Sequence, residues 1–199
     1  MLQKVKICNL QDISDADIKK TFFAMHPIRQ QKVLRQRQLN AQKQTLAGEF
    51  IARIMLEEES GIPFEEIVIL PNTNGKLCAE NTPVFFSISH SGEYVAIAVA
   101  DVEIGIDVEK RKQVSDKLVK KVCNEQEVLY VLGDKNNNAE LDEDACVRFL
   151  EVWTSKEAIF KCLGAWDGDY KSLDSFSEQF LKEKYITDDY VLHIVTKKR

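Results

Sequence analysis

Two short charged motifs, each set in an apolar segment, constrain this chain most strongly. The first, G-I-D-V-E at residues 105–109, alternates like a strand, so Asp107 and Glu109 point to the same face. The second, at residues 153–161, places Glu157 between two lysines within a long predicted helix. Carboxylates gathered near lysines match the needs of a divalent cation and a phosphate group. The pattern therefore predicts a strand and a helix that meet at one polar site.

Length and composition set the limits of the fold. The 199 residues are enough for one sizeable domain or two small ones that share a core. Hydrophobic residues make up 44% and charged residues 30%, an ordinary globular balance. The net charge of -5 argues against nucleic acid as a partner. No signal peptide is recognisable, and no run of about 18 apolar residues predicts a membrane span.

Cysteine usage indicates the redox environment. The five cysteines are an odd number, and no two have C-x-x-C spacing. This pattern favours reduced thiols in a cytoplasmic protein over a disulfide framework or a zinc site.

Periodicity and breaker residues predict alternating helices and strands. We expect helices at residues 15–25, 28–39, 40–60, 115–123, 126–132 and 143–163. We expect strands at 3–10, 67–70, 84–89, 94–100, 104–108, 176–181 and 190–196. Residues 90–93 predict a hairpin turn, and the polar segment 133–144 predicts a mobile surface loop.

A short internal similarity links the two ends of the chain. Residues 94–99 resemble residues 190–195, and each segment follows a Phe-Ser pair. Chance is the simpler explanation for so short a match. A duplication would instead mean two halves, each a long helix against a small antiparallel sheet, meeting in a cleft.

The carboxylates of the two motifs each have a simpler interpretation. Asp107 and Glu109 could lie on the wet face of an edge strand. Glu157 falls on an otherwise apolar helical stripe that includes Trp153, where a carboxylate costs stability unless it is paired or metal-bound. Lys161 follows one turn later, so an ordinary Glu157–Lys161 surface pair is the alternative.

Candidate phosphate ligands lie in the first half of the chain. Ser89 and His90 end a predicted strand, where binding residues are common. Lys76 lies in a polar turn, and Arg29 and Lys32 are one helical turn apart. The alternatives are a polar hairpin turn for the first pair and solvated surface positions for the others.

In this order, the motifs resemble the larger, pseudo-dimeric class of 4′-phosphopantetheinyl transferases. The similarity covers roughly residues 25–180. It rests on four segments: Gly75-Lys76, F-x-I-S-H-S-G at 86–92, G-I-D-V-E at 105–109, and W-x-x-K-E-x-x-x-K at 153–161. Each segment alone is modest, but the ordered set is specific.

The resemblance implies an α+β fold of two similar α/β halves, 1–102 and 103–199, with coenzyme A in the cleft between them. It implies transfer of the phosphopantetheine arm to a serine of an acyl or peptidyl carrier protein, with release of adenosine 3′,5′-bisphosphate. Coenzyme A, Mg²⁺ and a small acidic carrier would be the ligands and partner, and a monomer is expected.

The resemblance also implies roles for individual residues. Mg²⁺ ligands would be Asp107, Glu109 and Glu157. Residues near coenzyme A would be Arg29, Lys32, Lys76, Ser89, His90, Lys156 and Lys161. Glu157, directly or through a water, would deprotonate the serine, and Lys161 would neutralise charge on the leaving phosphate.

Three departures from the family pattern leave alternatives open. Leu77 replaces a usual proline, Gln44 stands where a basic residue is common, and the glycine-rich segment after Lys161 is altered at 162–168. One alternative is a relative that binds coenzyme A but has weak or lost transfer. A non-enzymatic interaction protein is a further alternative, which requires several coincidences among the motifs.

Overall fold

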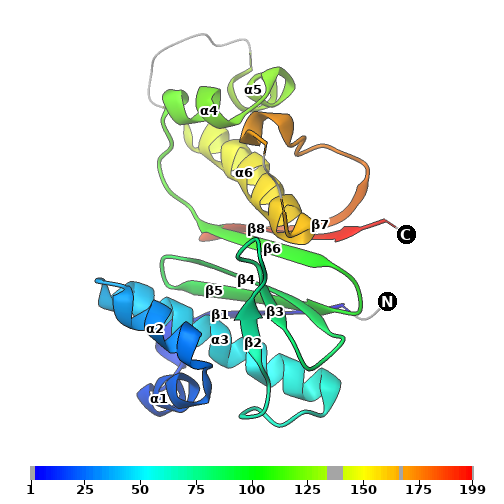
Figure 1. Cartoon of the computed structure of the whole chain (residues 1–199). Coiled ribbons are helices and arrows are strands. Elements are labelled where there is room, and N and C mark those ends of the chain that lie inside the picture. The colour runs from blue at the N-terminus through cyan, green and yellow to red at the C-terminus, as the bar shows by residue number, and fades with distance from the viewer. Residues whose placement is uncertain (1–2, 134–140, 166–167, 199) are drawn as a thin grey trace.

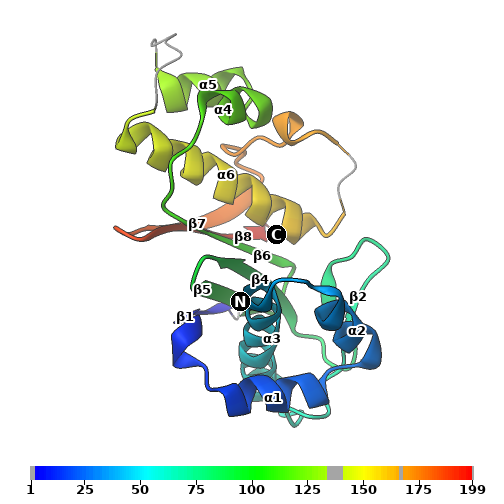
Figure 2. The same ribbon diagram turned by 90° about the vertical axis from the view of Figure 1, so that its left-hand side faces the viewer.

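The computed structural model describes residues 3–133, 141–165 and 168–198. The fold is α+β, and two three-stranded antiparallel sheets lie against each other at the middle of the molecule (Figure 1). Each sheet is covered on its outer side by one long helix, and the view turned by 90° shows the same stacking (Figure 2). The predicted fold class of two similar halves is confirmed.

The N-terminal half contains a sheet with strand order β1-β5-β4. The long helix α3 packs against β5, and α1 and α2 lie beside α3. A small two-stranded sheet, β2-β3, leads into β4. The bounds are β1 Gln3–Asn9, η1 Leu10–Asp12, α1 Asp15–Ala24, α2 Pro27–Arg35, α3 Leu39–Ser60, β2 Ile69–Pro71, β3 Leu77–Ala79, β4 Phe85–Ser91 and β5 Tyr94–Ala100.

The C-terminal half repeats this plan with strand order β6-β8-β7. The long helix α6 packs on β6 and β8, and α4 and α5 cover its N-terminal end. The bounds are β6 Ile104–Lys110, α4 Asp116–Val122, α5 Glu125–Leu132, α6 Glu143–Leu163, η2 Tyr170–Ser172, β7 Phe180–Ile186 and β8 Tyr190–Lys197.

The central strand β5 shows why the halves pack so closely. Its alanines, Ala96, Ala98 and Ala100, face β6 and β8 in one apolar cluster. Its larger residues point the other way, into the cluster under α3. A strand covered on both faces is apolar throughout, and small side chains on one face let the second sheet approach.

Gly105 permits a second close contact, between β6 and α6. A Cβ atom at this position would lie 1.9 Å from the carbonyl oxygen of Ala158. Any side chain would therefore push α6 away from the strand that carries the acidic motif. This contact explains the glycine of the G-I-D-V-E segment.

The two similar segments noted in the sequence occupy equivalent places. One forms β5 and the other β8, the central strands of the two sheets. The rings of Tyr94 and Tyr190 meet with centroids 5.0 Å apart. This placement favours the duplication over chance.

Most predicted elements are present, and the differences have local causes. The helix predicted at 28–39 ends at Arg35, because Gln42 donates a side-chain hydrogen bond to the carbonyl of Gln36, whose backbone is extended. The strand predicted at 176–181 begins only at Phe180, since residues 174–177 form a turn. Strand β3 was not predicted. Most of the loop predicted at 133–144 lies outside the described residues.

Two further observations concern the whole fold. All five cysteines are free, three of them buried. Over the described ranges, no helix combines the length and apolar character needed to cross a bilayer.

Candidate active site

A polar cleft of about 320 Å³ lies between the two halves. It brings together six of the predicted site residues: Arg29, Lys32, Ser89, His90, Asp107 and Lys161. The first four come from the N-terminal half and the last two from the C-terminal half. Residues far apart in the sequence thus meet at the interface of the sheets, as a shared cleft requires.

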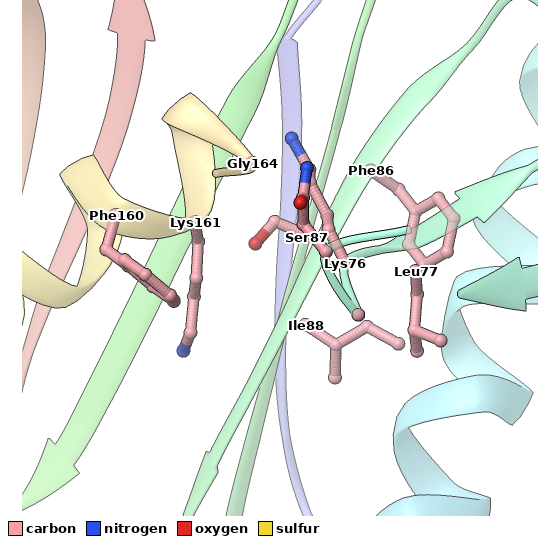
Figure 3. Close-up of a pocket in the computed structure, with 10 residues that line it drawn as sticks. Lys76, Leu77, Phe86, Ser87, Ile88, Phe160, Lys161 and Gly164 are labelled. Atoms are coloured by element: carbon pink, nitrogen blue, oxygen red, sulfur yellow. The ribbon is translucent and has the colours of Figure 1, made fainter. Parts of the chain in front are cut away.

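A more apolar pocket of about 260 Å³ adjoins this cleft. Figure 3 shows Phe160 and Lys161 of α6 on one side and Leu77, Phe86 and Ile88 on the other. Leu77, Ile88 and Lys161 line both cavities. The two cavities are therefore adjacent, the smaller one mainly apolar and the larger one lined by charged side chains.

Asp107 is the buried acid of the cleft. Its Oδ1 accepts hydrogen bonds from Ser89 Oγ at 2.7 Å and from Lys161 Nζ at 2.6 Å. Its Oδ2 is buried and receives no hydrogen bond within the described part of the chain. Burial raises the pKa of Asp107 to about 6, although Lys161 and Ser89 act in the opposite direction. A buried carboxylate oxygen without a partner is the feature expected where a cation binds.

Serines of β4 hold the edge of β6 at this point. The hydroxyls of Ser87, Ser89 and Ser91 accept hydrogen bonds from three alternate backbone amides of β6, at distances of 3.1–3.3 Å. Two of these hydroxyls also donate: Ser89 to Asp107, and Ser91 to Glu109 at 2.8 Å. The S-x-S-x-S spacing, which matches the D-x-E spacing, is a sequence signal for this contact. We did not use it.

The structure gives Ser89 a contact that was not predicted, while its predicted place beside coenzyme A stays a prediction. The sequence interpretation had this hydroxyl donate to a phosphate of coenzyme A. In the structure the hydroxyl proton goes to Asp107, and the side chain is 6% exposed. Ser89 therefore positions an acid of the opposite half.

Glu109 is half-buried and has several protein donors. Its Oε1 accepts from Trp153 Nε1 at 3.1 Å, and its Oε2 accepts from Ser91 and from Lys112 at 2.7 Å. The indole of Trp153 thus ties the helix α6 to the acidic strand.

Glu157 is also half-buried, and its partner was not predicted. Tyr170 donates its phenolic proton to Glu157 Oε1 at 2.6 Å. Burial, and then the hydrogen bond to Glu157, raise the pKa of Tyr170. The predicted alternative of a Glu157–Lys161 pair is wrong, because Lys161 binds Asp107 instead.

The carboxylates of Asp107, Glu109 and Glu157 do not converge as a complete set of metal ligands. Among the residues that the structure describes, no three His, Cys, Asp or Glu side chains are grouped as metal ligands. Asp107 and Glu157 are nonetheless close enough for the charge of Glu157 to raise the pKa of Asp107. The free Oδ2 of Asp107 is the atom that best fits a cation here.

Arg29 is held by a buried network under the cleft. Its guanidinium binds Glu49 Oε2, while Arg53 binds Glu49 Oε1 from the next turn of α3. Glu49 and Arg53 are fully buried and Arg29 is 3% exposed. Arg29 thus lines the cleft in a fixed orientation while Lys32 beside it is exposed.

His90 and Gln44 complete the N-terminal side. Partial desolvation, and then the charge of Lys161, lower the pKa of His90, although its side chain reaches solvent. Gln44 lines the cleft and donates to the carbonyl of Gly92 at 2.8 Å. Gln44 therefore places a neutral amide where a basic residue is common in the family.

The two remaining predicted lysines lie differently. Lys76 lines the apolar pocket and pairs with Glu103. Lys156 is fully buried and pairs with Glu127 at 2.6 Å. The prediction that Lys156 contacts coenzyme A conflicts with this burial. Lys156 is adjacent to Glu157 in the sequence, but successive side chains on a helix are about 100° apart, so the two point in different directions.

The remaining histidines have structural roles. His193 is buried, with Nδ1 2.8 Å from Thr154 Oγ1. Burial lowers the pKa of His193 to about 3, so it is neutral. His26 caps the N-terminus of α2.

Two family descriptions match this chain. Residues 103–193 match the 4′-phosphopantetheinyl transferase superfamily, and residues 13–102 match the N-terminal region of 4′-phosphopantetheinyl transferase. This chain belongs to the 4′-phosphopantetheinyl transferase superfamily. Its two matched regions correspond to the two halves of the structure, as in the larger class of that superfamily.

Curated relatives bear the same name. The transferase psf-1 of Bacillus pumilus is 28% identical over 92% of this chain and 78% of its own length. The transferase gsp of Aneurinibacillus migulanus is 32% identical over 66% of this chain, and Sfp of Bacillus subtilis is 31% identical over 67%. The chain matches only 52% and 56% of the lengths of these last two. All three relatives are 4′-phosphopantetheinyl transferases by name.

Proposed function

We propose that this protein transfers the 4′-phosphopantetheine arm of coenzyme A to a serine of an acyl or peptidyl carrier protein. The observation that carries the proposal is the cleft between the halves. It places Asp107, with a free buried oxygen, beside Lys161 and opposite three basic side chains of the other half. Coenzyme A, whose ribose carries a 3′-phosphate and a 5′-pyrophosphate, suits this distribution of charge.

The N-terminal half would bind the 3′-phosphate. Arg29, Lys32 and His90 line one side of the cleft, and Arg29 is oriented in advance by Glu49. A guanidinium held in place loses little freedom when it binds an anion.

Lys161 would act on the pyrophosphate. It reaches the cleft from α6 and is about three-quarters covered, paired with Asp107. A cation in such a sheltered place stabilises the negative charge that develops on the leaving adenosine 3′,5′-bisphosphate.

Asp107, Glu109 and Glu157 would hold Mg²⁺ against the pyrophosphate. When bound, Mg²⁺ supplies positive charge that neutralises the phosphate oxygens. The free Oδ2 of Asp107 fits this role, and a magnesium site needs only one or two protein carboxylates besides phosphate oxygens and water.

Glu157 would serve as the base. Its carboxylate is half-buried and close to Asp107. It would take the proton of the carrier serine, directly or through a water, as the serine oxygen bonds to the phosphorus of the phosphopantetheine arm. The bond from that phosphorus to the leaving bisphosphate then breaks.

The second candidate is a relative that binds coenzyme A without efficient transfer. The altered segment after Lys161 is its support, and residues 166–167 of that segment lie outside the described residues. The presence of all three carboxylates and of Lys161 favours the active enzyme. The division at 102/103, a monomeric state and a cytoplasmic location stay predictions.

A carrier assay separates the two candidates. The protein is incubated with coenzyme A, Mg²⁺ and several apo carrier proteins, and each carrier is weighed intact. A gain of one phosphopantetheine group supports the transferase. A thermal shift with coenzyme A but no gain on any carrier would leave the binding-only relative.

A further inference from the structure

Tyr170 contacts Glu157 and takes no part in the mechanism proposed above. It lies in the short helix η2, on the segment that returns from α6 to β7. Its hydroxyl donates to Glu157 Oε1 at 2.6 Å. A short hydrogen bond to a carboxylate is among the stronger polar contacts in proteins.

Aromatic neighbours fix the ring of Tyr170. Its centroid lies 5.2 Å from that of Trp153 and 6.3 Å from that of Phe160. These residues precede and follow Glu157 on α6, and Trp153 also stacks on Phe149. Packing on both sides restricts the phenol, so its hydroxyl has little freedom to leave the carboxylate.

A buried ion pair fixes the backbone of Tyr170. Lys156 Nζ donates to the carbonyl of Tyr170 at 2.7 Å and pairs with Glu127 at 2.6 Å. Glu127 Oε1 in turn accepts from the backbone amide of Ser175 at 2.9 Å. Both charged side chains are fully buried. The pair therefore holds residues 170–175 at two points, Tyr170 by Lys156 of α6 and Ser175 by Glu127 of α5. Lys156 thus has a structural role beside Glu157.

We propose that Tyr170 is a positioning residue that fixes the Glu157 carboxylate in the orientation needed for Mg²⁺ and for the carrier serine. The inference rests on the proposed function of Glu157. Tyr170 occupies Oε1, so Oε2 is the carboxylate oxygen that would serve Mg²⁺ or the carrier serine. Without the phenol, a half-buried glutamate has several rotamers open to it, and only some direct an oxygen toward Asp107.

The variant Tyr170→Phe removes the hydroxyl and keeps the ring packing. We expect Mg²⁺ to bind about tenfold more weakly to the coenzyme A complex, measured by calorimetric titration of the metal. We expect kcat to fall by about tenfold, while KM for coenzyme A stays within about twofold. The matched control is Tyr185→Phe, an exposed tyrosine of β7 whose hydroxyl also contacts a glutamate, and it should change neither quantity.

A double-mutant cycle tests whether Tyr170 acts through Glu157. In a Glu157→Ala background, Tyr170→Phe should leave Mg²⁺ affinity within about twofold, because the partner is already gone. A tenfold loss in that background would overturn the inference, as would wild-type Mg²⁺ affinity in Tyr170→Phe itself. If Glu157→Ala alone binds Mg²⁺ normally, the proposed metal role of Glu157 fails along with the inference. The two kinds of failure are therefore distinguishable.

Discussion

Ser89 of the N-terminal half donates a hydrogen bond to Asp107 of the C-terminal half, with 2.7 Å between Oγ and Oδ1. The same hydroxyl accepts from the backbone amide of Val108. One serine thus fixes both the strand and the carboxylate of the acidic motif. Since coenzyme A would contact both halves, this bond links the substrate side of the cleft to the metal side.

Replacement of Ser89 by alanine removes both the bond to the strand backbone and the bond to the Asp107 carboxylate. Comparison with a control variant separates the two contributions. We expect a loss of about 1 kcal/mol in the free energy of unfolding and about a tenfold lower kcat, because Asp107 loses its donor. Ser87→Ala is the matched control, since the Ser87 hydroxyl also accepts from an amide of β6, that of Ile106, in a bond that involves no carboxylate. Chemical denaturation and steady-state kinetics check both variants. Equal losses of kcat in the two would contradict a specific role for Ser89.

Glu157→Gln should nearly abolish transfer without unfolding the protein. The amide oxygen can still accept from Tyr170, and the side chain is only half-buried, so the free energy of unfolding should change by less than about 1 kcal/mol. The loss of the negative charge removes the base, for which a decrease in kcat of at least about 100-fold is expected. Near-normal turnover in this variant would show that the assigned base is wrong.

Asp107 should make the ligand-free protein less stable as pH rises. Burial disfavours the charged form and raises the pKa of Asp107 from its ordinary 3.8 to about 6 in the folded protein. Between these values the folded state holds the proton more tightly, so stability present at pH 4 is lost as pH rises through 6. The difference amounts to about 3 kcal/mol at most.

The variant Asp107→Asn removes this titration. Without coenzyme A and with EDTA present, we expect its Tm to exceed that of the wild type at pH 7 and to approach it at pH 4. The comparison between the two proteins cancels the contribution of His193, whose lowered pKa acts in the opposite direction. A Tm below that of the wild type at pH 7 would contradict the account of a carboxylate destabilised by burial.

Lys32→Ala should affect recognition of the 3′-phosphate alone. Lys32 is exposed and lines the cleft, so its loss should weaken binding of coenzyme A by about tenfold with little effect on folding. Binding of dephospho-coenzyme A, which lacks that phosphate, should not change. Lys43→Ala is the control, because Lys43 is a partly exposed lysine of α3 that pairs with Asp15 and does not line the cleft. Binding is measured by calorimetry. Equal losses of affinity for coenzyme A and dephospho-coenzyme A would mean that Lys32 does not contact the 3′-phosphate.

The long elements of the fold were predictable because their signals are local. The bounds of α6 follow from Asp142, which caps its first turn, and from Gly164, which ends it in a left-handed conformation. Strand β5 is equally clear as an apolar run between turn residues. The residues of the cleft could be named in advance because the four motifs lie in a specific order.

The partners of those residues could not be predicted, because each contact joins distant segments. Tyr170 belongs to a three-residue helix without periodicity, so nothing in its neighbourhood indicates that it reaches Glu157. In the sequence, Glu127 looks like an ordinary acidic residue in the first turn of α5. Its side chain is nevertheless fully buried and pairs with Lys156 of α6. A buried ion pair depends on the packing of both helices, which sequence spacing alone does not reveal.

The central claim is that this cleft carries out metal-dependent transfer of phosphopantetheine. The most direct measurement is the intact mass of an apo carrier protein after incubation with coenzyme A and Mg²⁺, with wild-type protein, with Glu157→Gln and with EDTA added. We predict that the carrier gains one phosphopantetheine group with the wild type, and almost none with the variant or with EDTA. An equal gain in all three samples, or no gain with the wild type on any carrier, would contradict the account.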